Sequence, residues 1–451
     1  GGDGMDCVVD PNDENIYYGF SQYGGRLNVT YNGGQTQGGS IAEAPKEEVD
    51  DDNQDSGGNW ITPLEADQKG NLYAGYSRVY QLINSQWERV SSDVFGGDLN
   101  NLSIAPSNEQ VMFASRINKL FKSTDKGITF EEIDITFSTL ISSIEINHQN
   151  ENIIYITTSG VDGRVLKSID GGENWEDISG NLPNDSKLVI KHQNQSLVND
   201  LFLGTNISVY HINDTMTQWE VFDTGLPNAP VYDIEINIED KVITAGTYGR
   251  GVFQSPIEVT KANIDLSLLS INTNNSVQCN GITPEITVKN NGVNVLKSVL
   301  IKYQVDGVPY DYTYDGEISS EEVRQIALPN NSDVAMGPHE LVVEIAVEND
   351  AFSDNNVLYA SFTSNKEGEG QYVNTFGDVN DDQWLEITLG DSNGLWEKSE
   401  AASDQFKNKF NQVYVTNANG NYSDETTSYL ISPCYDLSNL ENPMITFDMI
   451  F

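Results

Sequence analysis

The sequence predicts an all-β protein whose first half is a repeat array of the β-propeller type. Three observations indicate this: a period of about 45 residues, alternating strand patterns along the whole chain, and the composition. The 451 residues include 38 Gly and 21 Tyr, and only 20% are charged. Such a composition favours turns and strands over helices.

A short turn motif carries the repeat. Ser123–Phe130 reads STDKGITF and Ser168–Trp175 reads SIDGGENW, so their serines, at 123 and 168, lie 45 residues apart. Weaker copies close at residues 37, 87 and 219, which makes about five units visible. A fixed period of this size is a signature of propellers. The four strand-like segments in each unit fit one four-stranded blade.

The motif also has a structural explanation. The aspartate can accept hydrogen bonds from the backbone N–H groups that follow it, the glycine can adopt positive φ, and the aromatic residue can pack beneath the hairpin. An aspartate engaged in this way is a poor ion ligand. We therefore interpret the motif as structural, and assign that role to Ser123, Asp125, Gly127, Phe130, Ser168, Asp170, Gly172 and Trp175.

These motifs resemble Asp-boxes, the repeats of sialidases, sortilin-type receptors, xyloglucan hydrolases and plant photosystem-assembly propellers. Together with AGTYGRGVFQSP near residue 250, they look most like the large secreted propeller proteins of Bacteroidetes-type bacteria. The resemblance covers residues 1 to 257 and implies seven or more blades. We therefore expect residues 1–258 to be the C-terminal part of a propeller, within a longer polypeptide.

Residues 259–366 predict a second domain. Alternating strands follow one another at roughly 10-residue spacing, joined by Asn, Gly and Asp turns, which is typical of a sandwich of about seven strands. The segment resembles the CARDB-type, immunoglobulin-like module of bacterial surface proteins. That resemblance implies a spacer role, with direct ligand binding as the alternative.

Residues 367–451 resemble the beginning of a MAM-like jelly roll, also called choice-of-anchor J. About half of such a domain is present. Asp378, Asn380 and Asp382 place oxygen ligands at alternate positions, which suits a structural calcium ion. The run around residues 51, 53 and 55 has the same spacing, but we interpret it as a solvated acidic insertion.

The charge balance restricts the partners. The chain has 68 acidic and 24 basic residues, a net charge of −44, which excludes nucleic-acid binding and disfavours anionic membranes. No apolar run is long enough to span a bilayer. Cys7, Cys279 and Cys434 allow one disulfide in a secreted protein, but the spacing leaves the pairing open.

Catalytic motifs are absent from the sequence: it has no nucleophile elbow, no HExxH and no His-Cys cluster. The four histidines (148, 192, 211 and 339) are far apart along the chain, and we interpret each as an ordinary strand or loop residue. Thr215, between Asp214 and Met216, resembles the O-glycosylation signal of Bacteroidetes secreted proteins.

We therefore expect a secreted or cell-surface adhesion or recognition protein that binds a carbohydrate or protein ligand outside the cell. By resemblance, the type nine secretion machinery would export it through a sorting domain beyond Phe451. One alternative is a sialidase-like or xyloglucanase-like glycoside hydrolase with catalytic residues partly outside this segment. Another is a set of accessory domains of a secreted peptidase.

Overall fold

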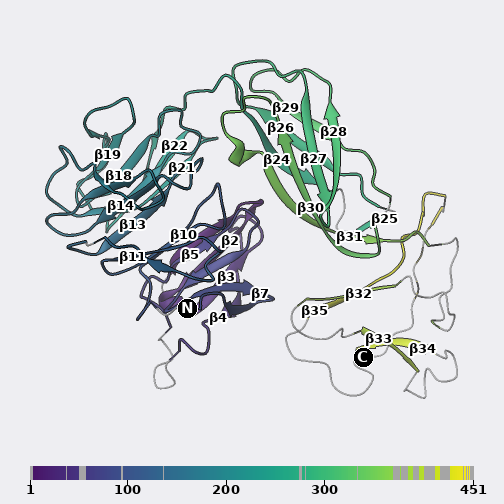
Figure 1. Cartoon of the computed structure of the whole chain (residues 1–451). Coiled ribbons are helices and arrows are strands. Elements are labelled where there is room, and N and C mark those ends of the chain that lie inside the picture. Colours follow the sequence, from purple (N-terminus) through teal and green to yellow (C-terminus); the bar gives the residue numbers. More distant parts are fainter. Residues whose placement is uncertain are drawn as a thin grey trace.

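The computed structural model describes residues 4–36, 38–49, 57–92, 95–135, 137–273, 277–279, 281–332, 334–368, 376, 384–389, 396–400, 412–416, 427–439, 441–442, 444 and 446. These residues form β-strands and two short 3-10 helices, η1 (Gln22–Gly24) and η2 (Ser353–Asn355). The fold is therefore all-β, as the sequence predicts (Figure 1). No helix in the described part is long and apolar enough to cross a membrane.

Six antiparallel sheets occupy residues 4 to 256, and their first strands lie next to one another in chain order. We number the sheets one to six. Consecutive first strands that contact each other around a central channel define a β-propeller. These first strands are β1 (Gly4–Asp10), β5 (Leu64–Ala66), β9 (Asn101–Ile104), β13 (Ile141–Ile146), β17 (Lys187–His192) and β21 (Val231–Asn237).

The other strands follow in order toward the outside of each sheet. Sheet one continues with β2 (Asp13–Ser21), β3 (Arg26–Thr30) and β4 (Gly39–Glu43), sheet two with β6 (Leu72–Gly75), β7 (Val79–Ile83) and β8 (Gln86–Arg89), and sheet three with β10 (Met112–Arg116), β11 (Lys119–Ser123) and β12 (Glu131–Glu132). Sheet four continues with β14 (Ile154–Thr158), β15 (Val165–Ser168) and β16 (Glu176–Asp177), and sheet five with β18 (Leu201–Thr205), β19 (Val209–Ile212) and β20 (Glu220–Val221). Sheet six continues with β22 (Val242–Thr247) and β23 (Gly251–Pro256).

The expected count of about five blades is one too low. Sheet six contains only the three strands β21, β22 and β23. It has no fourth strand and no closing turn motif, so counting the closing aromatic residues misses it. Its own side chains, among them Val231, Ile234 and Ile243, are buried in a core shared with sheet five.

Residues 266 to 365 form a two-sheet sandwich. One sheet has the order β24 (Leu266–Asn272), β26 (Glu285–Asn290), β29 (Val323–Ala327). The other has the order β25 (Val277–Cys279), β31 (Val357–Asn365), β30 (Gly337–Ala346), β27 (Val299–Val305), β28 (Val308–Tyr314). Alternate side chains of β26, β27 and β30 point into one buried core, as expected for two packed sheets.

Two small sheets lie beyond the sandwich. β32 (Leu385–Leu389) pairs with β35 (Thr427–Ile431), and β33 (Trp396–Glu400) pairs with β34 (Gln412–Thr416). A disulfide joins Cys279 on the sandwich to Cys434, while Cys7 is exposed and forms none. The structure thus identifies the cysteine pair that the sequence left open.

Candidate functional site

The first strands of the propeller place charged side chains around the central channel. Asp6, Glu65, Glu145, Lys191 and Glu235 come from five of the six sheets, and the last four line a cavity of about 210 Å³. Electrostatic interactions with Asp233 and Lys191 reach Asp6, so sheets five and six face sheet one across the channel.

These side chains also connect neighbouring sheets. Leu64 N donates to Asp6 Oδ2 at 3.0 Å, and His192 N donates to Glu145 Oε1 at 3.0 Å. Lys191 Nζ lies 3.4 Å from Glu235 Oε1. Channel side chains therefore join sheet one to sheet two, sheet four to sheet five, and sheet five to sheet six.

Burial raises the pKa of three channel carboxyl groups, those of Glu65, Glu145 and Asp6. Burial raises the pKa of Glu65 to about 8 and that of Glu145 to about 7, and burial raises the pKa of Asp6 to about 6. Each side chain keeps some surface toward the channel, but the enclosing strands exclude bulk solvent, which disfavours the charged form. Burial lowers the pKa of Lys191, but the nearby carboxylates, with Glu145 the strongest, outweigh it and raise that pKa.

Two histidines that are distant in sequence meet beside the channel. His148 and His192 stack with ring centroids 5.4 Å apart, and their Nδ1 atoms are 3.2 Å apart. Burial lowers the pKa of His148 to about 3 and that of His192 to about 4. His192 lies in strand β17 and His148 in the loop after β13, and their approach depends on the packing of sheet four against sheet five.

The sandwich covers one mouth of the channel. We call this end the covered face; the connections from first to second strands form it around the channel. Tyr359 N donates to Asn12 Oδ1 at 3.2 Å, and Lys69 lies over the Tyr359 ring. Hydrogen bonds from Asn194 and Gln149 act on the carboxyl of Asp354 in η2.

The opposite face, which we call the open face, exposes apolar side chains. Two kinds of connection form this face: those that join the second strand of a sheet to its third strand, and those that lead from one sheet into the first strand of the next. Each of sheets two to six contributes at least one such side chain, and the most exposed are Val161 at 77% and Tyr248 at 73%. The full set is Trp60, Ile61, Ile117, Leu140, Val161, Ile207, Tyr232 and Tyr248.

Hydrogen bonds hold neighbouring connections of the open face together. Ile141 N donates to Ile117 O at 2.8 Å, and Ser159 N donates to Leu140 O at 2.9 Å. Tyr232 and Tyr248 form an edge-to-face pair with centroids 6.1 Å apart. The apolar side chains are thus displayed by loops that contact one another.

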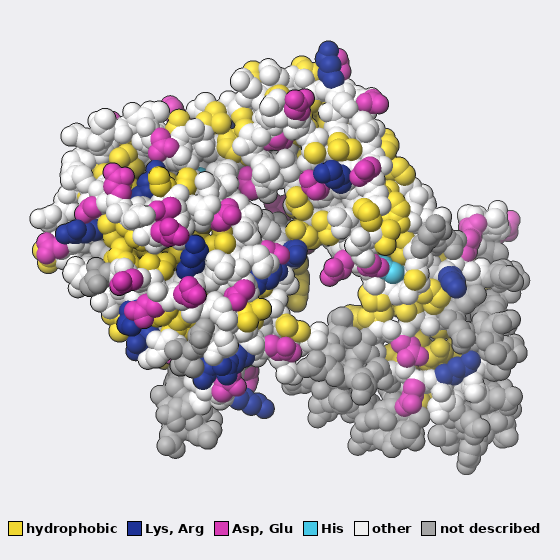
Figure 2. Space-filling model, in the orientation of Figure 1, with side chains coloured by type: hydrophobic (Ala, Val, Ile, Leu, Met, Phe, Trp, Pro, Cys, Tyr) yellow, Lys and Arg dark blue, Asp and Glu magenta, His cyan; other side chains and the backbone are white. Residues whose placement is uncertain are grey.

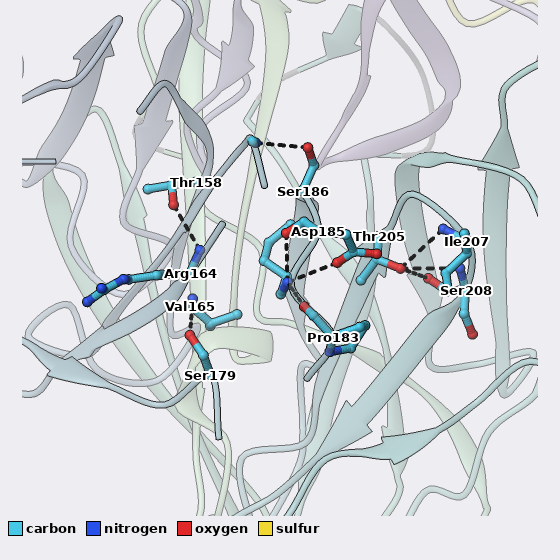
Figure 3. A network of polar contacts seen from close by, with 12 residues as sticks. Thr158, Arg164, Val165, Ser179, Pro183, Asp185, Ser186, Thr205, Ile207 and Ser208 are labelled. Carbon is cyan, nitrogen blue, oxygen red and sulfur yellow. Dashed lines mark hydrogen bonds and ion pairs between the residues drawn. The ribbon is translucent and has the colours of Figure 1, made fainter. Parts of the chain in front are cut away.

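A buried lysine binds the segment of Pro183 and Asp185 at the open face between sheets four and five, and Figure 3 shows that segment. Lys187 Nζ donates to Pro183 O at 2.7 Å, Asp185 O at 2.8 Å and Asp185 Oδ1 at 2.9 Å, and its side chain is 1% exposed. Gly160 N donates to Ser186 Oγ at 2.9 Å, which ties the Val161 loop to this segment. Nothing in the sequence around Lys187 signals this role.

The two turn motifs have the same hydrogen bonds. Asp125 Oδ1 accepts from Thr129 N at 2.9 Å, and Asp170 Oδ1 accepts from Asn174 N at 2.9 Å. Hydrogen bonds from the Asn174 side chain and backbone lower the pKa of Asp170 to about 2. Gly127 N donates to the hydroxyl of Ser123, and Gly172 N donates to the hydroxyl of Ser168. Both glycines have positive φ. The aromatic residues that close the two turns, Phe130 and Trp175, pack against the apolar cores.

The remaining candidate residues separate into two groups. Asp378, Asn380 and Asp382, proposed for calcium, lie outside the described residues, as do residues 51, 53 and 55. Thr215 lies in the turn between β19 and β20, exposed, with its hydroxyl donating to Asn213 Oδ1 at 2.7 Å. Within the described ranges, no cluster of three His, Cys, Asp or Glu side chains is arranged to hold a metal ion.

Comparisons with known proteins give structural similarity only. No protein family matches the sequence, and no curated protein matches it. The extracellular domain of a putative one-component system from B. thetaiotaomicron is 12% identical, with a TM-score of 0.41 over 80% of this chain and 49% of that chain. The chain therefore spans about half the length of that relative.

Two further solved structures cover other parts of the fold. A GH74 enzyme from Niastella koreensis is 15% identical, with a TM-score of 0.45 over 81% of this chain and 61% of that one. The CARDB domain of a Pyrococcus furiosus protein is 20% identical, with a TM-score of 0.21 over 23% of this chain and 96% of that one.

Proposed function

We propose that this chain is part of a secreted or cell-surface recognition protein whose propeller binds a carbohydrate or protein ligand at the open face. The observation that carries the proposal is the set of eight exposed apolar side chains at that face, seven on its connections and Tyr232 at the start of β21. Tyr232 and Tyr248 contact each other, and exposed apolar side chains that gather on one face commonly mark an interaction site. Aromatic side chains such as Tyr232 and Tyr248 are frequent anchors of binding surfaces.

The sandwich supports this orientation of the site. Because it covers the other mouth of the channel, a ligand meets the propeller from the open face. A sandwich in this position serves as the predicted spacer and also sets the direction in which the propeller faces. On the face that Figure 2 shows, Asp and Glu side chains are spread over the surface without gathering in one patch, which supports a role outside the cell.

Binding of a glycan array by the full chain tests the proposal. We expect the double substitution Tyr232→Ser with Tyr248→Ser to abolish binding. A matched control is Tyr31→Ser, because Tyr31 is also exposed but lies in the turn between β3 and β4, away from the open face. The proposal is refuted for glycans if the double variant binds normally, or if Tyr31→Ser loses as much binding as the double variant. The same comparison with a protein ligand completes the test.

The hydrolase alternative has one supporting observation. Glu65 and Glu145 have pKa values near neutrality and line the same cavity, a condition suited to acid–base catalysis. The cavity of about 210 Å³ is smaller than sites for small molecules, roughly 300–1,000 Å³, and the sandwich covers one mouth. Turnover of aryl glycosides by the wild type, lost in Glu65→Gln, would favour hydrolysis over recognition.

A further inference from the structure

A second cavity lies between the propeller and the sandwich, away from the open face. It has a volume of about 340 Å³, within the range of small-molecule sites. The turn after β21, the linker at residues 257–262 and the two sandwich strands β24 and β26 all contribute to its wall. The site therefore exists only when the two domains are docked.

Three lysines line this cavity, although the chain has 24 basic residues against 68 acidic ones. Lys261 is paired with Glu321, whereas Lys289 Nζ lies 3.9 Å from Glu239, at the limit of an ion pair. Lys241, on the propeller turn, has no carboxylate within 4.0 Å in the described part of the chain. One ammonium group is thus unpaired and a second is only loosely paired.

Three carboxyl groups, Glu239, Asp265 and Glu321, line the same cavity as the three lysines, so its net charge depends on their protonation. Asp265 is 3% exposed, and burial raises its pKa to about 6. Three lysines, with Lys261 first, lower the pKa of Glu321 through its hydrogen bond and their charges. The lowered pKa of Glu321 fits a wall in which cations are close together. Asp265 holds little charge only below about pH 6.

An unpartnered acceptor lies in the same wall. Asn355 Nδ2 donates to Asp265 Oδ1 at 3.1 Å, which fixes the orientation of the amide. Asn355 Oδ1 is buried and has no hydrogen-bond partner among the described residues. A buried acceptor without a partner is costly, so it favours a ligand that brings a hydroxyl donor. Apolar contacts are available from Ile238, Leu268 and Phe352.

We propose that this interdomain cavity binds a small hydroxylated carboxylate of the uronic-acid class. Lys241 and Lys289 receive the carboxylate, Asn355 Oδ1 accepts a hydrogen bond from a hydroxyl group, and the apolar wall packs against the ring. Ligand binding then stabilises the docked arrangement of propeller and sandwich, because both domains contribute to the site.

Calorimetric titration of the full chain with D-glucuronate tests this proposal. D-glucose, which has the hydroxylated ring without the carboxylate, and acetate, which has the carboxylate without the ring, are titrated for comparison. We expect glucuronate to bind, and both other compounds to bind at least tenfold more weakly. Lys241→Gln and Lys289→Gln should each weaken glucuronate binding tenfold or more. Lys302→Gln is the matched control, since Lys302 pairs with Glu344 on the exposed sandwich surface, and it should leave binding unchanged.

Asn355→Asp supplies an independent test, because it keeps the size of the side chain and adds a negative charge at the acceptor. We expect it to remove glucuronate binding while circular dichroism and the melting temperature stay near wild type. The proposal is wrong if glucuronate does not bind the wild type, if glucose or acetate binds equally well, or if Lys289→Gln and Asn355→Asp both bind normally. Tyr248→Ser should bind glucuronate normally, which separates this site from the open face.

Discussion

The two faces of the propeller use opposite chemistry. The covered face meets the sandwich through polar and charged side chains: Asn12, Lys69, Gln149 and Asn194 contact Tyr359 or Asp354. The open face shows apolar side chains to solvent, from Trp60 to Tyr248. Polar contacts suit an interface formed once within one chain, whereas exposed apolar surface is retained when a partner covers it for part of the time.

The channel between the faces explains why they remain distinct. Channel side chains link the first strands of neighbouring sheets, for example through the contact of Lys191 on β17 with Glu235 on β21. Neighbouring sheets also share buried apolar cores, so losing a channel contact weakens their packing without removing it. The comparison can therefore be tested by substitutions in the channel, at the covered face and at the open face.

We expect the largest effect from Lys191→Met. The substitution removes the cation near Glu145, and an unpaired charge in a largely enclosed site is strongly destabilising. It also removes the ion pair with Glu235, whose side chain is 68% exposed. Since Lys191 keeps 33% of its side-chain surface exposed, we expect a loss of about 2 kcal/mol at pH 8, below the full cost for a buried pair. Urea unfolding followed by tryptophan fluorescence measures it, and an unchanged midpoint would mean that the channel does not hold the sheets together.

The pH dependence comes next. Glu65, Glu145 and Asp6 have folded pKa values of about 8, 7 and 6, above their ordinary values of 4.5, 4.5 and 3.8. Their protonation stabilises the fold fully below about pH 4, and this contribution is lost as the pH rises through 6 to 8. The melting temperature should thus fall between pH 5 and pH 8.

Glu65→Gln keeps the uncharged form at all pH values, so it should reduce that fall. Glu176→Gln, on the exposed strand β16, is the control and should behave like the wild type. A wild-type melting temperature that is the same at pH 5 and pH 8 would argue against protonated carboxyl groups in the channel.

A smaller effect is expected at the covered face. Tyr359→Ala removes the ring beneath Lys69, an interaction worth about 0.5–1 kcal/mol at exposed sites. The propeller and sandwich should then separate more often, and the linker at residues 257–262 should be cut faster by trypsin. Val308→Ala, at an exposed sandwich position, should leave the cleavage rate unchanged; equal rates in all three proteins would place the domain contact elsewhere.

The smallest effect on stability is expected at the open face. Ile117→Ser and Tyr248→Ser alter side chains that are 52% and 73% exposed, and such changes usually shift stability by less than about 0.5 kcal/mol. Binding of the carbohydrate or protein ligand at the open face should be lost, while the melting temperature stays unchanged. A drop of several degrees would show that these side chains belong to the core rather than to a binding surface.

The regular part of the fold could be predicted from the sequence. The period of about 45 residues depends on local turn motifs, and the strands depend on side chains that alternate between two faces. Both patterns can be read directly from the order of residues along the chain. Sheet six was missed because it lacks the closing motif on which the count relied. Two strands of its core, β21 and β22, are as apolar as those of the other sheets.

The site could not be predicted in the same way, because its residues meet only after packing. Glu65, Glu145 and Lys191 are separated by about one repeat or more, and nothing in their neighbours marks them as channel residues. The pairing of Cys279 with Cys434 likewise depends on the position of β25 beside β31. Contacts between sheets and between domains are set by tertiary geometry that a single sequence does not display.

The disulfide between Cys279 and Cys434 affects the outcome of proteolysis. The two cysteines are separated by 155 positions in the sequence, and the enclosed segment includes most of the sandwich. A single backbone cleavage inside this segment produces two fragments that remain one covalent molecule until a reductant acts. A cleavage in the linker at residues 257–262 has the opposite outcome, because there only non-covalent contacts retain the propeller.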